Sequence, residues 1–358
     1  MKNLNIIWTI AYKDILDGLK NKVVLSIVAG VLFMLSMPAL MAWMIEPPFA
    51  NVLVFDPGSS QLVNLIDEDE AFRVQRLPSL EAFEEAVANL GFGVGIEYGL
   101  MVPADFDEKA ENNGEAAVEV YVPWSFRKKI PELKEQIEAQ LTALRGLTVT
   151  ANFEQNIVYP PPQSTLTMGL TTQMPVIIIL MVGLSMMPHL FFEEKQTRTM
   201  DAMLVSPATE GQIVAGKAVV GMFYILVTAF IAFGLNWTRV VHWELVAIFV
   251  VFGGLFGVGV GVILGTFFNR YQEIFGWSML LLLVLIAAIF IQMLEVDLPG
   301  WAQTVIPWIP SAGMAKIVIA SFMQEIDWGM VFDNIASVLV ISAVMYSLIA
   351  WRLRRSDR

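Results

Sequence analysis

The sequence predicts an α-helical polytopic membrane protein with six transmembrane helices and an extracellular α/β domain inserted between the first and second helices. Six apolar stretches of 18 to 24 residues contain no Asp, Glu, Lys or Arg. A helix rises 1.5 Å per residue, so about 20 residues cross the roughly 30 Å hydrocarbon core of a bilayer. Hydrophobic residues make up 56% of the 358-residue chain, and most of the polar sequence lies between the first two stretches.

The expected spans are residues 23–45, 174–192, 218–237, 245–268, 275–294 and 334–351. Residues 1–22 precede the first span, and we expect them to form an amphipathic helix in the cytoplasmic interface. Leu4, Trp8 and Tyr12 repeat at spacing four, whereas charged residues such as Lys13 take another face. These charges argue against a simple extension of the first span.

The net charge of -12 belongs to one block of the chain. Residues 46–166 contain 20 acidic and 8 basic residues, so the remainder is neutral. Lys and Arg in short loops stay preferentially in the cytoplasm. If both termini are cytoplasmic, the inner segments hold twelve basic residues, and only Arg239 and Lys316 lie in the short loops opposite. We therefore expect a multi-pass protein of the cell membrane with both termini inside and residues 46–166 outside.

Apolar and polar segments alternate within residues 46–166. We expect strands at residues 51–55, 93–102 and 116–122, and helices at residues 79–90, 105–112 and 131–144. Strands that alternate with helices indicate an α/β domain with a mixed or parallel sheet. Asp105 and Glu108, three residues apart, outline a capping box. Cysteine is absent, so this domain folds without disulfides.

The second to sixth spans lie within residues 167–358, and residues 295–333 separate the last two. This segment is too long for a turn, yet its apolar part, residues 312–323, is too short to cross a membrane. Pro299, Pro307 and Pro310 interrupt it. We expect short re-entrant helices on the extracellular side rather than a plain surface loop.

Gly211, Gly216 and Lys217 match the G-x-x-x-x-G-K pattern of a phosphate-binding loop. Such a loop requires a preceding buried strand and a Ser or Thr after the Lys to hold magnesium. Ala218 follows the Lys, and an apolar span begins at once. The match therefore does not indicate nucleotide binding by this chain.

The fourth span carries glycines at spacing four. They are Gly253, Gly257, Gly261 and Gly265. Glycines at this spacing remove the side chains from one ridge of a helix, so that another helix backbone can approach closely. The ridge indicates tight helix packing rather than chemistry.

The segment after the second span, residues 193–217, is the most specific part of the sequence. It contains Glu193, Glu194, Lys195, Thr197, Leu204, Ser206, Pro207, Gly216 and Lys217. This pattern resembles the cytoplasmic segment of type-2 ABC exporter permeases. In that family an acidic-Lys-Gly-Thr run leads into a short helix, then into Leu-x-(Ser/Thr)-Pro, and finally into Gly-Lys at the next span. Gln196 replaces the usual Gly of the run.

The resemblance extends over nearly the whole chain and points to the branch with a large extracellular domain, which includes sodium-export permeases. It implies that two copies of the chain pair and bind two separate ABC ATPase subunits. It also implies that a coupling helix within residues 193–217 inserts into the ATPase. Tyr271, Gln272 and Glu273 would face the second cytoplasmic contact. ATP and magnesium would bind to the partner, and this chain would carry no cofactor and no catalytic residue.

The spans themselves support an external energy source. Ion-coupled secondary transporters place ionisable groups inside their spans to bind the coupling ion. These spans contain no Asp, Glu, Lys or Arg, and their one histidine is His189 near the end of the second span. Energy is therefore expected to arrive through the cytoplasmic loops. The resemblance implies a cargo that is a small ion, lipid, peptide or drug-like molecule and that is moved outward.

Two other classes of function were weighed. A non-transporting membrane sensor or scaffold would use the extracellular domain to bind a ligand or partner, and the sequence leaves this alternative open. A membrane enzyme is disfavoured, because His189 and His242 are the only histidines and no catalytic pattern surrounds them. The acidic residues 67–70 fit a solvated loop better than a calcium site. The expected partners are the lipid bilayer, a second copy and an ABC ATPase, with no nucleic acid.

Overall fold

The computed structural model describes residues 2–45, 50–70, 72–88, 90, 97–113, 115–146, 148–153, 156–159, 166–196, 209–268, 270–293 and 299–356. The chain divides into two compact units. The first is a helical bundle of Met1–Ser36, Gly169–Ser321 and Glu325–Arg358, and the second is an α/β unit of Met37–Met168 with Phe322–Gln324.

The α/β unit contains one mixed sheet. Its strands are β1 (Ala50–Phe55), β2 (Phe72–Arg76), β3 (Glu97–Met101), β4 (Glu115–Pro123), β5 (Thr148–Asn152) and β6 (Ile157–Val158). They follow the order β2-β1-β3-β4-β5, and β6 pairs with β4. β1 runs parallel to β2 and β3, β4 is antiparallel to β3, and β5 is parallel to β4. The α/β character expected from the sequence is confirmed.

Each face of this sheet has its own core, because successive side chains of a strand point to opposite faces. Val52 and Val54 of β1 belong to the larger core. The helices on that side are α3 (Gln61–Glu68), α5 (Phe106–Asn113) and α6 (Ile130–Arg145). Leu53 and Phe55 of β1 belong to the smaller core, which Phe83 of α4 (Leu80–Ala88) fills. Among the described elements of this unit, α4 is the helix that covers the second face.

The helical bundle contains seven long or amphipathic helices among the described residues. They are α1 (Lys2–Gly18), α2 (Lys22–Ile45), α7 (Leu166–Gln196), α9 (Glu210–Leu235), α10 (Trp243–Phe267), α11 (Tyr271–Met293) and α14 (Trp328–Ser356). Five of them, α7, α9, α10, α11 and α14, are each long and apolar enough to cross a membrane. α1 and α2 are bent by 74° at the turn between them. If this bent pair counts as one span, the total is six.

The helices extend beyond the apolar stretches that predict them. α9 begins at Glu210, eight positions before the expected span at residue 218. Its start is fixed by a capping box, in which the Thr209 hydroxyl accepts from the Gln212 backbone N–H and the Gln212 side chain accepts from the Thr209 N–H. Polar residues continue a helix as readily as apolar ones, so hydropathy alone understates its length.

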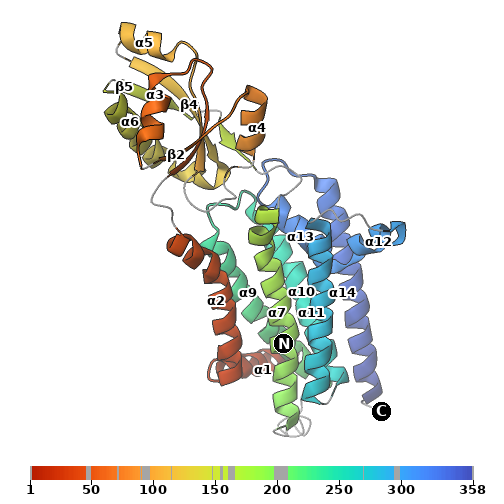
Figure 1. Cartoon of the computed structure of the whole chain (residues 1–358). Coiled ribbons are helices and arrows are strands. Elements are labelled where there is room, and N and C mark those ends of the chain that lie inside the picture. Colours follow the sequence, from red (N-terminus) through yellow and green to blue (C-terminus); the bar gives the residue numbers. More distant parts are fainter. Residues whose placement is uncertain are drawn as a thin grey trace. The chain divides into compact units, whose positions relative to one another are not determined.

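Three short helices separate α11 from α14, where the sequence predicts broken helices. They are α12 (Gly300–Val305), η2 (Ile306–Trp308) and α13 (Pro310–Ala320). The Ser311 hydroxyl of α13 donates to the Leu285 carbonyl oxygen of α11 at 2.7 Å, and the Val241 and His242 N–H groups donate to the Ser321 carbonyl. α13 is thus a buried part of the bundle. Figure 1 shows α12 and α13 at the end of the bundle opposite α1.

Candidate functional site

The candidate site is the end of the bundle where α1 lies, and we call it the α1 end. It is formed by α1, the C-terminus of α7 and the N-termini of α9 and α11 (Figure 1). The predicted coupling residues Thr197, Leu204, Ser206 and Pro207 lie outside the described residues. Glu194 and Lys195 lie in the last turns of α7. The described helices therefore fix where residues 197–208 leave and re-enter the bundle.

Glu193 binds the elbow between α1 and α2. The side-chain amide of Asn21 donates to both carboxylate oxygens of Glu193, at 2.8 and 2.7 Å. The Asn21 side-chain oxygen accepts from the Val23 N–H at 2.8 Å and so caps the start of α2. A hydrogen bond to an ionised carboxylate is stronger than one between neutral groups. The end of α7 is thereby attached to the elbow.

Lys217 lies inside the bundle rather than at its surface. Its ammonium Nζ is 3.4 Å from Asp14 Oδ2 of α1, and the two side chains are only 1% and 8% exposed. The Phe191 ring of α7 lies 5.1 Å from the same Nζ, a cation–π distance. Gly211 and Gly216 also lie within helix α9, so the G-x-x-x-x-G-K match is not a phosphate-binding loop here. The Lys is used for packing and pairing.

Two glycines allow α1 to approach α9. A Cβ at Gly216 would lie 2.9 Å from Cγ2 of Ile10, closer than real side-chain contacts. A Cβ at Gly18 would collide with the hydroxyl of Tyr224, which donates to the Ile15 carbonyl oxygen at 3.1 Å. The Gly216 of the family-like Gly-Lys pair is therefore required by the contact between α1 and α9.

The second predicted contact lies at the same end. Tyr271, Gln272 and Glu273 form the first turn of α11 and are exposed. The Tyr271 ring lies 5.4 Å from the ring of Phe192 of α7, measured between centroids. The structure thus brings the start of α11 beside the helix end from which residues 197–208 depart. Hydropathy could not have predicted that α7 and α11 are neighbours here, because this depends on how the helices are arranged in the bundle.

The glycine ridge of α10 packs against α7 of the same chain. A Cβ at Gly261 would collide with the backbone oxygen of Gly183, and one at Gly265 would lie 2.7 Å from the Phe191 ring. Gly257 lies near the Ile179 oxygen, also in α7. Gly253, at the other end of the ridge, faces Met314 of α13. The two backbones approach closely because both helices carry glycine at the crossing.

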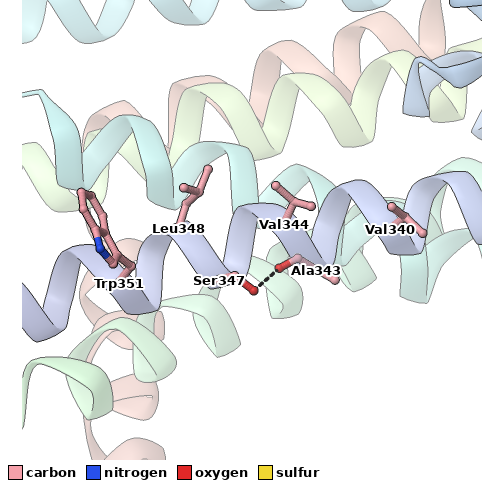
Figure 2. A pocket seen from close by; sticks show the side chains of 6 residues that line it. All are labelled: Val340, Ala343, Val344, Ser347, Leu348 and Trp351. Atoms are coloured by element: carbon pink, nitrogen blue, oxygen red, sulfur yellow. Dashed lines mark hydrogen bonds between the residues drawn. The ribbon is translucent and has the colours of Figure 1, made fainter.

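The outer face of α14 holds a shallow groove of about 620 Å³. Figure 2 shows its lining side chains, Val340, Ala343, Val344, Ser347, Leu348 and Trp351. The Ser347 hydroxyl donates to the Ala343 carbonyl oxygen at 2.7 Å, so it is already satisfied within the helix. The groove suits hydrocarbon and offers no reactive group.

The described part of the chain holds no group of three or more His, Asp or Glu side chains placed to bind a metal ion. The two histidines lie apart in sequence, and each has a carboxylate neighbour. His242 Nδ1 is 3.0 Å from Glu244 Oε1, and His189 Nε2 is 4.0 Å from Glu193 Oε2. A His beside a carboxylate is not by itself evidence of a catalytic or metal site.

Five or six apolar helices that could span a membrane, with a small α/β region near the N-terminus, define a multi-pass membrane protein. A profile of the ABC-2 family transporter proteins matches residues 22–352. The chain therefore belongs to the ABC-2 family transporter proteins and is a permease-type subunit of an ABC transporter, which normally works with an ABC ATPase. A comparison with curated proteins finds no match.

Proposed function

We propose that the chain is the transmembrane subunit of an ATP-driven exporter that works as a homodimer with a separate ATPase. One observation carries the coupling part of this proposal. The helix ends that flank residues 197–208 lie at the same end of the bundle as Tyr271, Gln272 and Glu273, with Tyr271 against Phe192. An ATPase bound at the α1 end would touch both segments at once. Dimerisation and outward transport rest on the family resemblance.

Coupling follows from how the helices at this end are packed. The family resemblance implies that residues 194–207 contact the ATPase, and a movement there would reach α7 and α9, to which this segment is joined in sequence. α7 transmits the movement to α10, because the backbones of Gly183 and Gly261 are in contact and leave no compressible side chain between them. ATP and magnesium are held by the ATPase, and this chain supplies the path that the cargo takes across the membrane.

The cargo is a small ion, lipid, peptide or drug-like molecule. The spans expected from the sequence carry no acidic or basic residue except His189, which fits an apolar or amphipathic cargo. Backbone carbonyls and hydroxyls at an interface between two copies would instead suit an ion. The large domain and the order of elements support the branch that includes sodium-export permeases.

The proposed topology places both termini and residues 193–217 in the cytoplasm, and residues 46–166 outside the cell. It rests on the excess of Lys and Arg in the segments assigned to the cytoplasm. Because the chain has no cysteine, single cysteines can be introduced and labelled in intact cells. We expect a membrane-impermeant reagent to label Asn113→Cys and not Ser206→Cys. Labelling of Ser206→Cys without labelling of Asn113→Cys would contradict the proposed orientation.

A second candidate is a sensor or scaffold that does not transport. The α/β unit favours it, since a cavity of about 650 Å³ lies beside β1, β2 and α4 and is lined in part by Asn51, Arg73 and Gln75. Polar groups in a cavity of this size are typical of a small-ligand site. Purification of the chain from native membranes separates the two candidates. Copurification of an ABC ATPase supports the exporter, and its absence supports the sensor.

A further inference from the structure

The contact between α1 and the bundle contains a buried ion pair. Asp14 and Lys217 are nearly inaccessible to solvent, and Asp14 Oδ2 lies 3.4 Å from Lys217 Nζ. Two charges are removed from water only at a large cost, which their attraction offsets when both are present. Loss of either partner leaves the other charge buried without this counter-charge. The pair therefore strongly favours one position of α1 along α9.

Three helices meet at this pair. Asp14 comes from α1, Lys217 from α9, and the Phe191 ring that lies against the ammonium from α7. Ala11, one turn before Asp14, is completely buried. Asp17, three residues after Asp14, is exposed. Only one face of α1 is thus held against the bundle.

The elbow after α1 has a separate attachment. Asn21 donates to both oxygens of Glu193 at the end of α7 while its own oxygen caps α2. α1 is therefore fixed to the start of α9, and the elbow is fixed to the end of α7. These two helix ends flank residues 197–208.

We propose that Asp14 and Lys217, together with Asn21 and Glu193, are positioning residues that join the α1–α2 elbow to both ends of the coupling segment. Glu193 and Lys217 then act inside the permease, although the family resemblance groups them with residues that face the ATPase. A movement of residues 197–208 would carry α7, α9 and the elbow together. The attachment of α1 follows from the structure alone, and its part in coupling rests on the proposed function.

The position of α1 can be measured in the cysteine-free chain. A cysteine at Ala11, which is completely buried, should react slowly with a maleimide, whereas one at Lys13, which is exposed, should react fast. Asp14→Asn removes the carboxylate charge that faces the buried Lys217 ammonium, so we expect it to raise the labelling rate of Ala11→Cys by roughly a hundredfold. Asp17→Asn is the matched control on the exposed face and should change nothing.

The exchanged pair, Asp14→Lys with Lys217→Asp, should restore the slow labelling of Ala11→Cys. Unchanged labelling of Ala11→Cys in Asp14→Asn would overturn the proposal, as would equal effects of Asp14→Asn and Asp17→Asn. If Asp14→Asn lowers the yield of inserted protein, Asn21→Ala provides a second variant that keeps both buried charges. It should release the elbow, and a cysteine at Val24, which is buried, should then label faster.

The coupling part has its own readout. In complexes with the ATPase, Asp14→Asn should lower ATP hydrolysis per copurified ATPase while the amount of ATPase stays unchanged. A purely structural role would lower both together and would count against positioning. Failure of the inference is distinct from failure of the proposed function. If the inference fails, the complex with Asp14→Asn hydrolyses ATP at the unsubstituted rate. If the proposed function fails, no ATPase copurifies even with the unsubstituted chain.

Discussion

The ion pairs described in the α/β unit lie at its surface, whereas the helical bundle contains one that is buried. The side chains of Arg76 and Asp67 are each about half exposed, and those of Lys109 and Asp105 are similar. Exposed pairs contribute about 0–1 kcal/mol. Breaking a buried pair such as Asp14 and Lys217 by removing one partner costs about 3–5 kcal/mol. The buried pair of the bundle therefore holds two helices together, while the exposed pairs of the α/β unit contribute little to stability.

The same contrast appears in packing. The α/β unit is filled by large side chains, such as Phe83 between the sheet and α4. The contact between α7 and α10 depends instead on missing side chains, at Gly183, Gly257 and Gly261. Each unit should therefore be most sensitive to the opposite kind of substitution. Truncation should damage the α/β unit, and added volume should damage the bundle.

The largest effect is expected from replacing Gly257 and Gly261 together by Leu. Added volume in a packed core costs about 1–3 kcal/mol per site and occasionally more. The neighbours here include backbone atoms of α7, which cannot rotate away. The sum approaches the total stability of many proteins, about 5–15 kcal/mol. We expect little folded protein by size-exclusion chromatography in detergent.

Gly276→Leu in α11 is the matched control for this pair, because a Cβ there meets nothing within 4 Å. It should leave the elution profile unchanged. A normal profile for the Gly257 and Gly261 variant would show that the two helices do not need close contact.

A smaller effect is expected from Phe83→Ala in α4. The Phe83 ring is fully buried and meets the Tyr121 ring edge-on at a centroid distance of 5.3 Å. Truncation of a buried Phe costs about 3–5 kcal/mol. Limited proteolysis should then cleave the α/β unit faster while the bundle melts as before. Leu80→Ala at an exposed position should behave like the unsubstituted chain, and equal loss of stability in both units would refute their independence.

The smallest effect is expected from Lys109→Met. A 2.6 Å hydrogen bond from Lys109 lowers the pKa of Asp105 below its ordinary value. A carboxyl group with a lowered pKa adds stability above its unfolded pKa, and that stability is lost as the pH falls through the folded value. Lys109→Met should therefore raise the pKa of Asp105 in an NMR titration with little change in melting at neutral pH. An unchanged pKa would contradict the assigned cause.

Sequence patterns predicted the five long apolar helices and part of the α/β unit. The expected strand at residues 51–55 and helix at residues 131–144 correspond to β1 and α6 within one residue at each end. β2 and β5 were not expected. β2 carries Arg73 and Arg76 at the edge of the sheet, and β5 contains only two apolar residues, Val149 and Ala151, so neither stands out by hydrophobicity.

The site was predicted less completely than the fold. The motif singled out Glu193 and Lys217, yet spacing cannot tell whether a charged residue faces a partner or its own chain. Asp14 and Asn21 carried no motif signal, since their importance arises from the 74° bend that lays α1 against α9. A buried charge can be located only once its surroundings are known.

The central claim is that the α1 end binds an ATPase through residues 194–207, and copurification with hydrolysis tests it most directly. Glu194→Lys reverses a charge, and Leu204→Asp removes the apolar anchor of a docked helix. Glu81→Lys, at an exposed site in the first turn of α4, is the control for charge reversal. We expect normal insertion of all three variants. Both changes in residues 194–207 should abolish ATPase binding or uncouple hydrolysis from transport, and Glu81→Lys should do neither. Unsubstituted levels of bound ATPase and of hydrolysis in both variants would contradict the claim.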